Sequence, residues 1–267
     1  MTDTPPFQTF DARRFSNGDW APQSFTLADE VPIALVYNDI SHAVMMASPM
    51  NLEDFALGFS LTEGIIQAAH EILDIEVVEV ANGIEVRITL IQRRLAGLKD
   101  HRRSMTGRTG CGLCGTESLS AAIRPLNPII NESRIPAQRL IDGVLALDAS
   151  QDLRKATRAA HAAGWLTEQG LVLWREDVGR HNALDKVIGA SLKTDLVPKD
   201  AVMVVSSRCS VEMVQKTVAI GVPVLAAVAS PTSLAVKLAD QWGLTLVTSL
   251  RPDSFNVLTH SQRIVSV

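Results

Sequence analysis

Residues 201–249 read AVMVVSSRCS VEMVQKTVAI GVPVLAAVAS PTSLAVKLAD QWGLTLVTS, and this stretch decides the fold. It alternates short apolar runs with segments of helical periodicity. Runs that are apolar throughout are typical of strands covered on both faces, and helices between such strands indicate right-handed crossovers. The strands are expected at 201–206, 223–228 and 244–249, and the helices at 211–220 and 232–242.

The same pattern continues upstream as far as Pro136. It predicts the order α-β-β-α-β-α-β-α-β, which is that of a three-layer α/β domain. We assign residues 136–267 to this domain. The additional helices are expected at 137–147 and within 153–158, the strands at 160–166 and 171–176, and a further helix at 182–190.

The first part of the chain reads as a smaller α+β domain, 1–103. Two hairpins are expected, at 31–46 around Asn38-Asp39 and at 72–90 around Asn82-Gly83, with a helix between them that carries Phe55 to Leu61. The first 25 or so residues are rich in Pro, Ser, Asp and Phe, and we expect an irregular leading arm. Residues 104–135 are expected to form a mobile loop and linker.

Composition limits the class of protein. The 267 residues are 46% hydrophobic and 20% charged, which is globular, and the net charge of −4 argues against a nucleic-acid partner. No apolar run of about 18 residues predicts a membrane helix, and the N-terminus lacks a secretory pattern. We expect a cytoplasmic protein.

The segment 99–115, KDHRRSMTGRTGCGLCG, carries the strongest chemical signal. Cys111 and Cys114 are spaced to share a metal ion, form a disulfide or pass a sulfur atom between them. The nearby basic side chains favour the thiolate. A structural zinc site would need a second ligand pair, and the chain has none at a convincing spacing.

A second candidate lies at 176–186, EDVGRHNALDK, where a strand leads into a helix. Such a junction suits phosphate or nucleotide contact, and Asp177 is expected to cap the helix. The alternative is a capped helix with a solvated charged face. The candidate binding residues are Asp177, Arg180, His181 and Asn182.

Two further strand-to-helix turns, 206–213 and 230–233, repeat this geometry. The first contributes Ser207 and Arg208, and Cys209 beside them reads as a small buried residue. Together with the segment after the last strand, these turns would form one continuous rim. Arg251 in that segment suits either a phosphate or a surface salt bridge.

The blocks TGRTGCGLCG (106–115) and EDVGRHNALDKVIG (176–189), in this order, resemble the FdhD family of formate dehydrogenase accessory sulfurtransferases. The similarity extends over most of the chain. The matching segments are 30–66, 106–115, 161–166, 176–189 and 206–248.

The resemblance implies a sulfurtransferase with a cysteine persulfide intermediate. Such a protein accepts sulfur from an IscS-like cysteine desulfurase, and Cys111 corresponds to the carrier. It delivers the sulfur to a molybdenum or tungsten bis(molybdopterin guanine dinucleotide) cofactor before insertion into formate dehydrogenase. Cys114 would assist release or share the sulfur. The resemblance also implies a homodimer and no resident metal.

The resemblance further implies a C-terminal domain like cytidine deaminase, without the deaminase zinc ligands. The family's nucleotide-cofactor contact falls on Leu250, Arg251, Pro252, Asp253, Ser254 and Phe255. This chain departs there, because Pro252 stands where a glycine is expected and removes a backbone N–H. Leu258 stands where a tyrosine is common.

Two other functions stay open from the sequence. One is a chaperone that binds the cofactor without moving sulfur. The other is a zinc-dependent deaminase.

Overall fold

The computed structural model describes residues 4–94, 123–194 and 196–266. Its larger sheet has six strands in the order β13-β12-β11-β10-β8-β9. The central strands β10, β11 and β12 are parallel, and β8 runs antiparallel to β10. The strands are β8 (His161–Thr167), β9 (Gly170–Asp177), β10 (Val202–Val205), β11 (Val224–Ala227), β12 (Thr245–Thr248) and β13 (Asn256–Val257).

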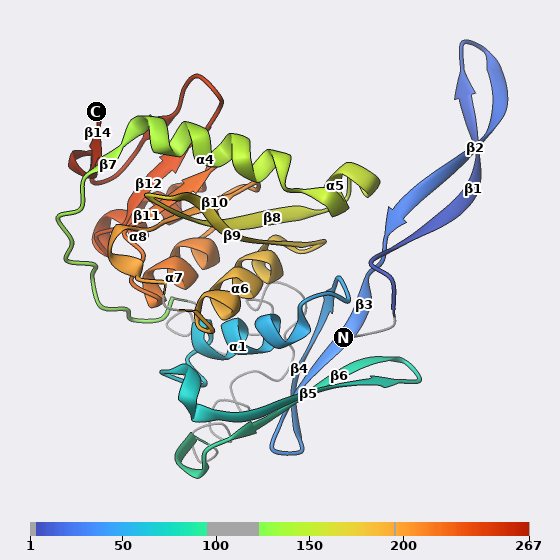
Figure 1. The fold of residues 1–267 in the computed structure, drawn as a ribbon, viewed down its shortest axis with the longest axis horizontal. Helices are drawn as coiled ribbons and strands as arrows, with labels where there is room; N and C mark the ends of the chain where they lie inside the picture. The colour runs from blue at the N-terminus through green and yellow to red at the C-terminus, as the bar shows by residue number, and fades with distance from the viewer. Residues whose placement is uncertain (1–3, 95–122, 195, 267) are drawn as a thin grey trace.

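Helices cover both faces of this sheet, as the apolar strands predict. Helix α4 packs on one face through Leu140, Val144 and Leu147, and α6, α7 and α8 pack on the other. The predicted three layers are therefore present (Figure 1), whereas a deaminase-like relationship stays a prediction. The helices are α4 (Ala137–Ala149), α5 (Asp152–Thr157), α6 (Arg180–Ser191), α7 (Val211–Ala219) and α8 (Ser233–Gln241).

The N-terminal unit is a four-stranded sheet with one helix on its inner face. The strand order is β4-β3-β6-β5, and alternate residues of β3, such as Ile33, Leu35 and Tyr37, are fully buried beneath the helix. This alternation is typical of a sheet with one covered face. The elements are β3 (Val31–Tyr37), β4 (Ile40–Ala47), α1 (Leu52–Thr62), β5 (Ile72–Val80) and β6 (Gly83–Leu90).

The leading arm is a regular β-hairpin, so the expectation of an irregular segment is wrong. Strand β1 (Phe7–Ser16) pairs with β2 (Asp19–Ala28) along its whole length, and the ribbon projects from the body (Figure 1). Asn17 and Gly18 both adopt positive φ, as a tight two-residue turn requires.

The two units meet where α1 crosses α6. A Cβ added to Gly58 would lie 1.8 Å from the backbone oxygen of Asp185, and one added to Gly189 would lie 1.8 Å from that of Asp54. The helices therefore touch backbone to backbone, which only glycine permits. Helix α6 therefore packs against both units, and this contact fixes the edge of the six-stranded sheet relative to the N-terminal unit.

Short elements complete the fold. Strands β7 (Ile135–Pro136) and β14 (Ile264–Val265) pair in parallel and join the end of the predicted linker to the C-terminus. Single 3-10 turns lie at Ala69–Glu71 (η1), Pro198–Asp200 (η2) and Ser261–Arg263 (η3). Within the described ranges, no helix has the length and apolar character needed to cross a membrane.

Candidate functional site

The predicted rim lies at the carboxyl edge of the six-stranded sheet. Strands β9 to β12 all end at this edge, because β8 is antiparallel to both β9 and β10. Neighbouring loops are joined by hydrogen bonds: the N–H of Thr232 donates to the carbonyl of Cys209 at 3.0 Å, and that of Leu250 to Ala227 at 3.2 Å. The loops after β10, β11 and β12 therefore form one surface.

Asp177 does not cap helix α6, so that expectation is wrong. Its carboxylate is fully buried and forms an ion pair with Lys186 Nζ at 2.6 Å. It also accepts from the N–H groups of Ser48 and Gly179 and from the amide side chain of Asn182. The helix begins at Arg180 with Gly179 in the capping position.

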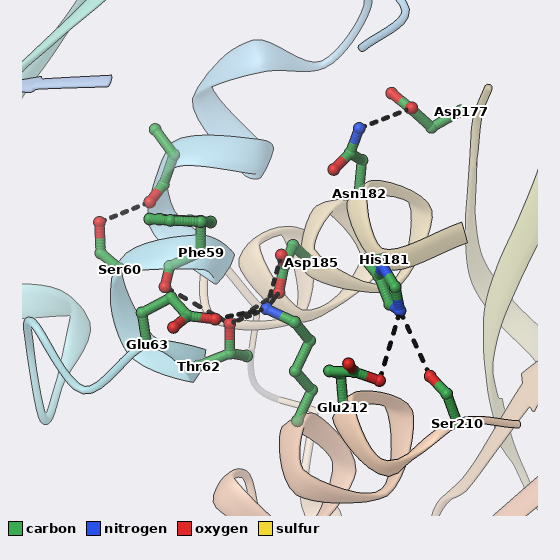
Figure 2. Close-up of polar contacts among 12 residues, drawn as sticks. Phe59, Ser60, Thr62, Glu63, Asp177, His181, Asn182, Asp185, Ser210 and Glu212 are labelled. Atoms are coloured by element: carbon green, nitrogen blue, oxygen red, sulfur yellow. Dashed lines mark hydrogen bonds and ion pairs between the residues drawn. The ribbon is translucent and has the colours of Figure 1, made fainter. Parts of the chain in front are cut away.

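Asn182 is buried as well and links two parts of the chain. Its side chain donates to the carbonyl of Met46 at 2.9 Å. It also donates to Asp177 at 3.0 Å (Figure 2). The structure thus gives Asp177 and Asn182 internal partners, and both hold the junction of β9 and α6 against the end of β4.

Glu176, the neighbour of Asp177, contacts helix α5 on the other face of the sheet. Its two carboxylate oxygens accept from the backbone N–H groups of Leu153 and Arg154, both at 2.9 Å. These donors lie in the first turn of α5, where N–H groups lack a partner within the helix. A side chain of the sheet therefore caps this helix.

His181 points from α6 towards the start of α7 (Figure 2). Its Nε2 lies 3.4 Å from Ser210 Oγ and 3.8 Å from Glu212 Oε2. Burial is the main cause that lowers the pKa of His181 to about 4, and Arg180 and Lys216 add to the shift. The imidazole is therefore neutral at pH 7 and can accept or donate one hydrogen bond.

Arg180 and Arg208 bring positive charge to the rim. Arg180 is half-buried at the first turn of α6, and Arg208 is exposed in the loop after β10. Within the part of the chain that the structure describes, neither forms an ion pair with a carboxylate. Their uncompensated charge, next to a helix N-terminus, attracts anions.

Ser207 and Cys209, which flank Arg208, are buried. The Ser207 hydroxyl donates to the carbonyl of Arg208 at 3.0 Å. Burial raises the pKa of the Cys209 thiol to about 12, so this side chain is a packed, protonated thiol, as expected.

The segment 250–255 forms a turn beside the rim. Leu250 is buried, whereas Pro252, Asp253 and Ser254 are exposed. The backbone N–H of Arg251 donates to the carbonyl of Ser254 at 2.8 Å, and its guanidinium donates to the carbonyl of Val228 at 2.8 Å. Arg251 therefore ties two loops together, and Phe255 packs against the α4 side of the core.

A buried polar cluster that the sequence does not predict lies between α1, α6 and α7 (Figure 2). Lys216 Nζ contacts both carboxylate oxygens of Asp185 at 2.9 Å, the Thr62 hydroxyl at 2.9 Å and Glu63 at 3.1 Å. Thr62 also donates to Asp185 at 2.7 Å. These partners are too far apart in sequence for any local pattern to indicate the cluster.

Cys111 and Cys114 lie outside the described residues. Residues on either side of these cysteines have defined contacts. Arg94 forms an ion pair with the buried Glu71 at 2.7 Å. The guanidinium of Arg124 donates to the carbonyl of Thr62, and its backbone N–H donates to the side chain of Gln215. Hydrogen bonds from Arg94, from Gln67 and from Arg93 lower the pKa of Glu71 to about 2. The described ranges contain no group of three or more potential metal ligands.

Fold and site together define a two-unit α/β protein. At the carboxyl edge of its six-stranded sheet lie two arginine side chains and the N-terminus of a helix. A sequence profile described as the FdhD/NarQ family matches residues 28–265, and the chain belongs to this family.

Curated relatives and a solved structure are similar over nearly the full length. The chain is 46% identical over 263 residues to the sulfur carrier protein FdhD of Cupriavidus necator, which covers 98% of this chain and 91% of the relative. It is 46% identical over 239 residues to the same-named protein of Agrobacterium fabrum, with 89% and 88% covered. The crystal structure of a protein named as a formate dehydrogenase accessory protein from Desulfotalea psychrophila superposes with a TM-score of 0.80 at 25% identity, covering 98% of this chain and all of that one.

Proposed function

We propose that this chain is a sulfurtransferase that carries sulfur as a cysteine persulfide for the maturation of formate dehydrogenase. The observation that supports it is the similarity, over 98% of the chain, to a curated sulfur carrier protein, together with the pair Cys111 and Cys114. The source is an IscS-like cysteine desulfurase.

In the first step, the Cys111 thiolate attacks the outer sulfur of the desulfurase persulfide. A new S–S bond forms on Cys111, the old one breaks, and the desulfurase cysteine leaves as a thiolate. No net oxidation or reduction takes place. The basic residues 99–108 favour the Cys111 thiolate, because positive charge stabilises the ionised form.

In the second step, the Cys114 thiolate attacks the inner sulfur of the Cys111 persulfide. The outer sulfur leaves as sulfide, its electron pair comes from the S–S bond, and a Cys111–Cys114 disulfide remains. A thiol reductant then restores both cysteines. The sulfide becomes a ligand of the metal cargo.

The cargo is a molybdenum bis(molybdopterin guanine dinucleotide) cofactor, bound as substrate before its insertion into formate dehydrogenase. Its phosphates would contact the helix N-terminus at Arg180, with Arg208 supplying charge. His181, Ser207 and residues 250–255 line the same rim, while Asp177 and Asn182 hold the loop that presents it. The working form is a homodimer in the cytoplasm.

The test is the intact mass of the protein after incubation with a cysteine desulfurase and cysteine. Wild type should gain the mass of one sulfur atom, and a thiol reductant should remove it. Cys111→Ala should gain none, whereas Cys209→Ala, which removes a buried thiol, should gain it as wild type does.

Three results would contradict the proposal. A sulfur adduct on Cys111→Ala would move the carrier to another residue. Cofactor binding without any sulfur uptake by wild type would favour a chaperone. Stoichiometric zinc with cytidine turnover would indicate a deaminase.

A further inference from the structure

The arm formed by β1 and β2 carries most of the exposed aromatic surface of the protein. It is a two-stranded sheet that pairs with no other described strand, and it projects from the body (Figure 1). Within the described ranges, Trp174 is the one exposed aromatic residue outside the arm. A ribbon of two strands is marginally stable alone in water, so this arm needs a surface to cover it. Its exposed aromatic residues are Phe7, Phe10, Phe15, Trp20 and Phe25.

The two faces of the arm differ in how far their aromatic rings are already packed. Side chains alternate along a strand, so the register assigns Phe10 and its partner Phe25 to one face. It assigns Phe15 and its partner Trp20 to the other, where the two rings lie 5.2 Å apart and the guanidinium of Arg13 lies 5.4 Å from the Trp20 ring. In the part of the chain that the structure describes, no ring or cation contacts Phe10 or Phe25 in this way. The Phe10–Phe25 face is therefore the one left for a partner.

Opposite charges lie at equal distances on either side of the Phe10–Phe25 pair. On the same face, Arg14 lies four residues beyond Phe10, towards the tip of the arm. Asp29 lies four residues beyond Phe25, towards the base, and its carboxylate accepts a hydrogen bond from Gln8 of this face at 2.9 Å. A two-fold axis through the aromatic pair places Arg14 of each copy beside Asp29 of the other.

We propose that the Phe10–Phe25 face of the arm binds the same face of a second copy of this chain, with the two arms antiparallel. In a two-fold dimer one surface must complement itself, and this face does so through its central rings and its opposed charges. A different protein partner would require no such symmetry. The inference specifies the contact of the homodimer in the proposed function, and it rests on that function.

The exposed area is of the size that a dimer contact needs. A buried Phe or Trp covers about 150–250 Å², so five half-exposed rings leave roughly 500 Å² of aromatic surface on each arm. Two arms together reach about 1,000 Å², which is the lower limit for a biological interface. Each strand of the arm is about 30 Å long, so the tip of one arm, with Phe15 and Trp20, reaches the base of the other.

The base of the arm lies beside the rim. Strand β2 leads into β3, whose first residue Val31 pairs with Ala47 at the end of β4. The next residue, Ser48, donates from its N–H to Asp177 at 3.0 Å, and its hydroxyl accepts from the N–H of Val178 at 3.1 Å. Arms that pair over their full length therefore bring the tip of one copy next to the loop after β9 of the other.

The first experiment measures the dimer dissociation constant of the full-length protein by sedimentation velocity over a range of concentrations. Phe10→Ser/Phe25→Ser removes four rings from the contact, so dimerisation should weaken at least about 100-fold. Both side chains lie outside the three hydrophobic cores, so the body should stay folded. The control is Leu73→Ser/Val80→Ser, which removes two exposed apolar side chains of β5 and should dimerise as wild type does. A monomeric wild type, or an unchanged dissociation constant for Phe10→Ser/Phe25→Ser, would overturn the proposal.

An exchange of charges tests the antiparallel arrangement. Arg14→Glu alone and Asp29→Lys alone should each weaken dimerisation at least about tenfold, because each places like charges side by side twice in the dimer. A mixture of the two variants should dimerise again, since both contacts of the mixed dimer join opposite charges. Within one arm the two positions lie about 27 Å apart, beyond the Debye length of about 8 Å, so a rescue cannot arise inside one copy. A mixture that dimerises no more tightly than either variant alone would overturn the arrangement.

Sulfur uptake separates this inference from the proposed function. Wild type that dimerises through the arm but accepts no sulfur on Cys111 would overturn sulfur carriage and leave the contact in place. Wild type that accepts sulfur, and dimerises equally well without the two rings, would overturn the contact alone. Phe10→Ser/Phe25→Ser that is monomeric and still gains one sulfur atom would support both, because the variant is then folded and lacks only the contact.

Discussion

Lys216 of α7 and Asp185 of α6 form a buried ion pair in which Nζ lies 2.9 Å from both carboxylate oxygens. Burial alone would lower the pKa of Lys216, but Asp185 and Glu63 beside it raise it instead. The lysine therefore stays charged, and its partners in α1 and α6 compensate this buried charge.

Asp185→Asn should destabilise the protein strongly. It leaves the charge of Lys216 without its main partner, and breaking a buried pair costs about 3–5 kcal/mol. The free energy of unfolding from denaturant titration measures this. The control is Glu53→Gln, which breaks an exposed pair with Lys193 and should cost less than about 1 kcal/mol. The double variant Asp185→Asn/Lys216→Met should lose less than Asp185→Asn alone, and equal losses for Asp185→Asn and Glu53→Gln would contradict the account.

Gly58→Ala should separate α1 from α6. The new methyl group would meet the backbone oxygen of Asp185 at 1.8 Å, and backbone cannot move aside. We expect a loss of about 3 kcal/mol or more, at the upper end of overpacking effects. Gly143→Ala in α4 is the matched control: its methyl group meets only the end of the Leu166 side chain, at 2.6 Å, so stability should stay within about 1 kcal/mol of wild type. Similar melting temperatures for the two variants would argue against the helix contact.

His181 should make stability depend on pH. Its pKa is lowered to about 4 in the folded state, so the unfolded state binds the proton more readily. Stability should therefore fall as the pH decreases from about 6.5 towards about 4, by up to about 3 kcal/mol from this residue. Unfolding of wild type and His181→Gln should be compared at several pH values. The proposed contribution does not exist if the two curves remain parallel.

Cys209 should resist alkylation in the folded protein. Its thiol is buried and its pKa is raised to about 12, so almost no thiolate forms at neutral pH. The variant Cys111→Ala/Cys114→Ala leaves this as the one thiol in the chain. Iodoacetamide labelling, followed by mass spectrometry, should be negligible under native conditions and rapid in guanidinium chloride. Equal labelling rates would show that the side chain is accessible.

Most of the fold follows from the sequence, because buried strands and amphipathic helices leave local patterns. The strands β10, β11 and β12 begin and end within one residue of the expected runs. The N-terminal hairpin does not follow from the composition of its segment, which favours an irregular arm, although Asn17-Gly18 is a strong turn signal. The family resemblance extended the prediction to function.

The site was harder to predict because its charges pair across long sequence distances. Helix α6 carries Asp185 and Lys186 side by side, which reads as a solvated charged face. Both are buried, and their partners Lys216 and Asp177 belong to α7 and β9. A local pattern cannot show such pairing.

Glu176 and Asp177 show what the acidic start of the family block does in this protein. One carboxylate ends in the first turn of α5 and the other in a pair with Lys186, on opposite sides of the sheet. A mutational scan across the block should therefore reduce cellular abundance at 176 and 177, but ligand affinity at 180. A growth assay on formate would not by itself distinguish lower abundance from lower affinity. Measuring the protein level together with growth would separate the two effects.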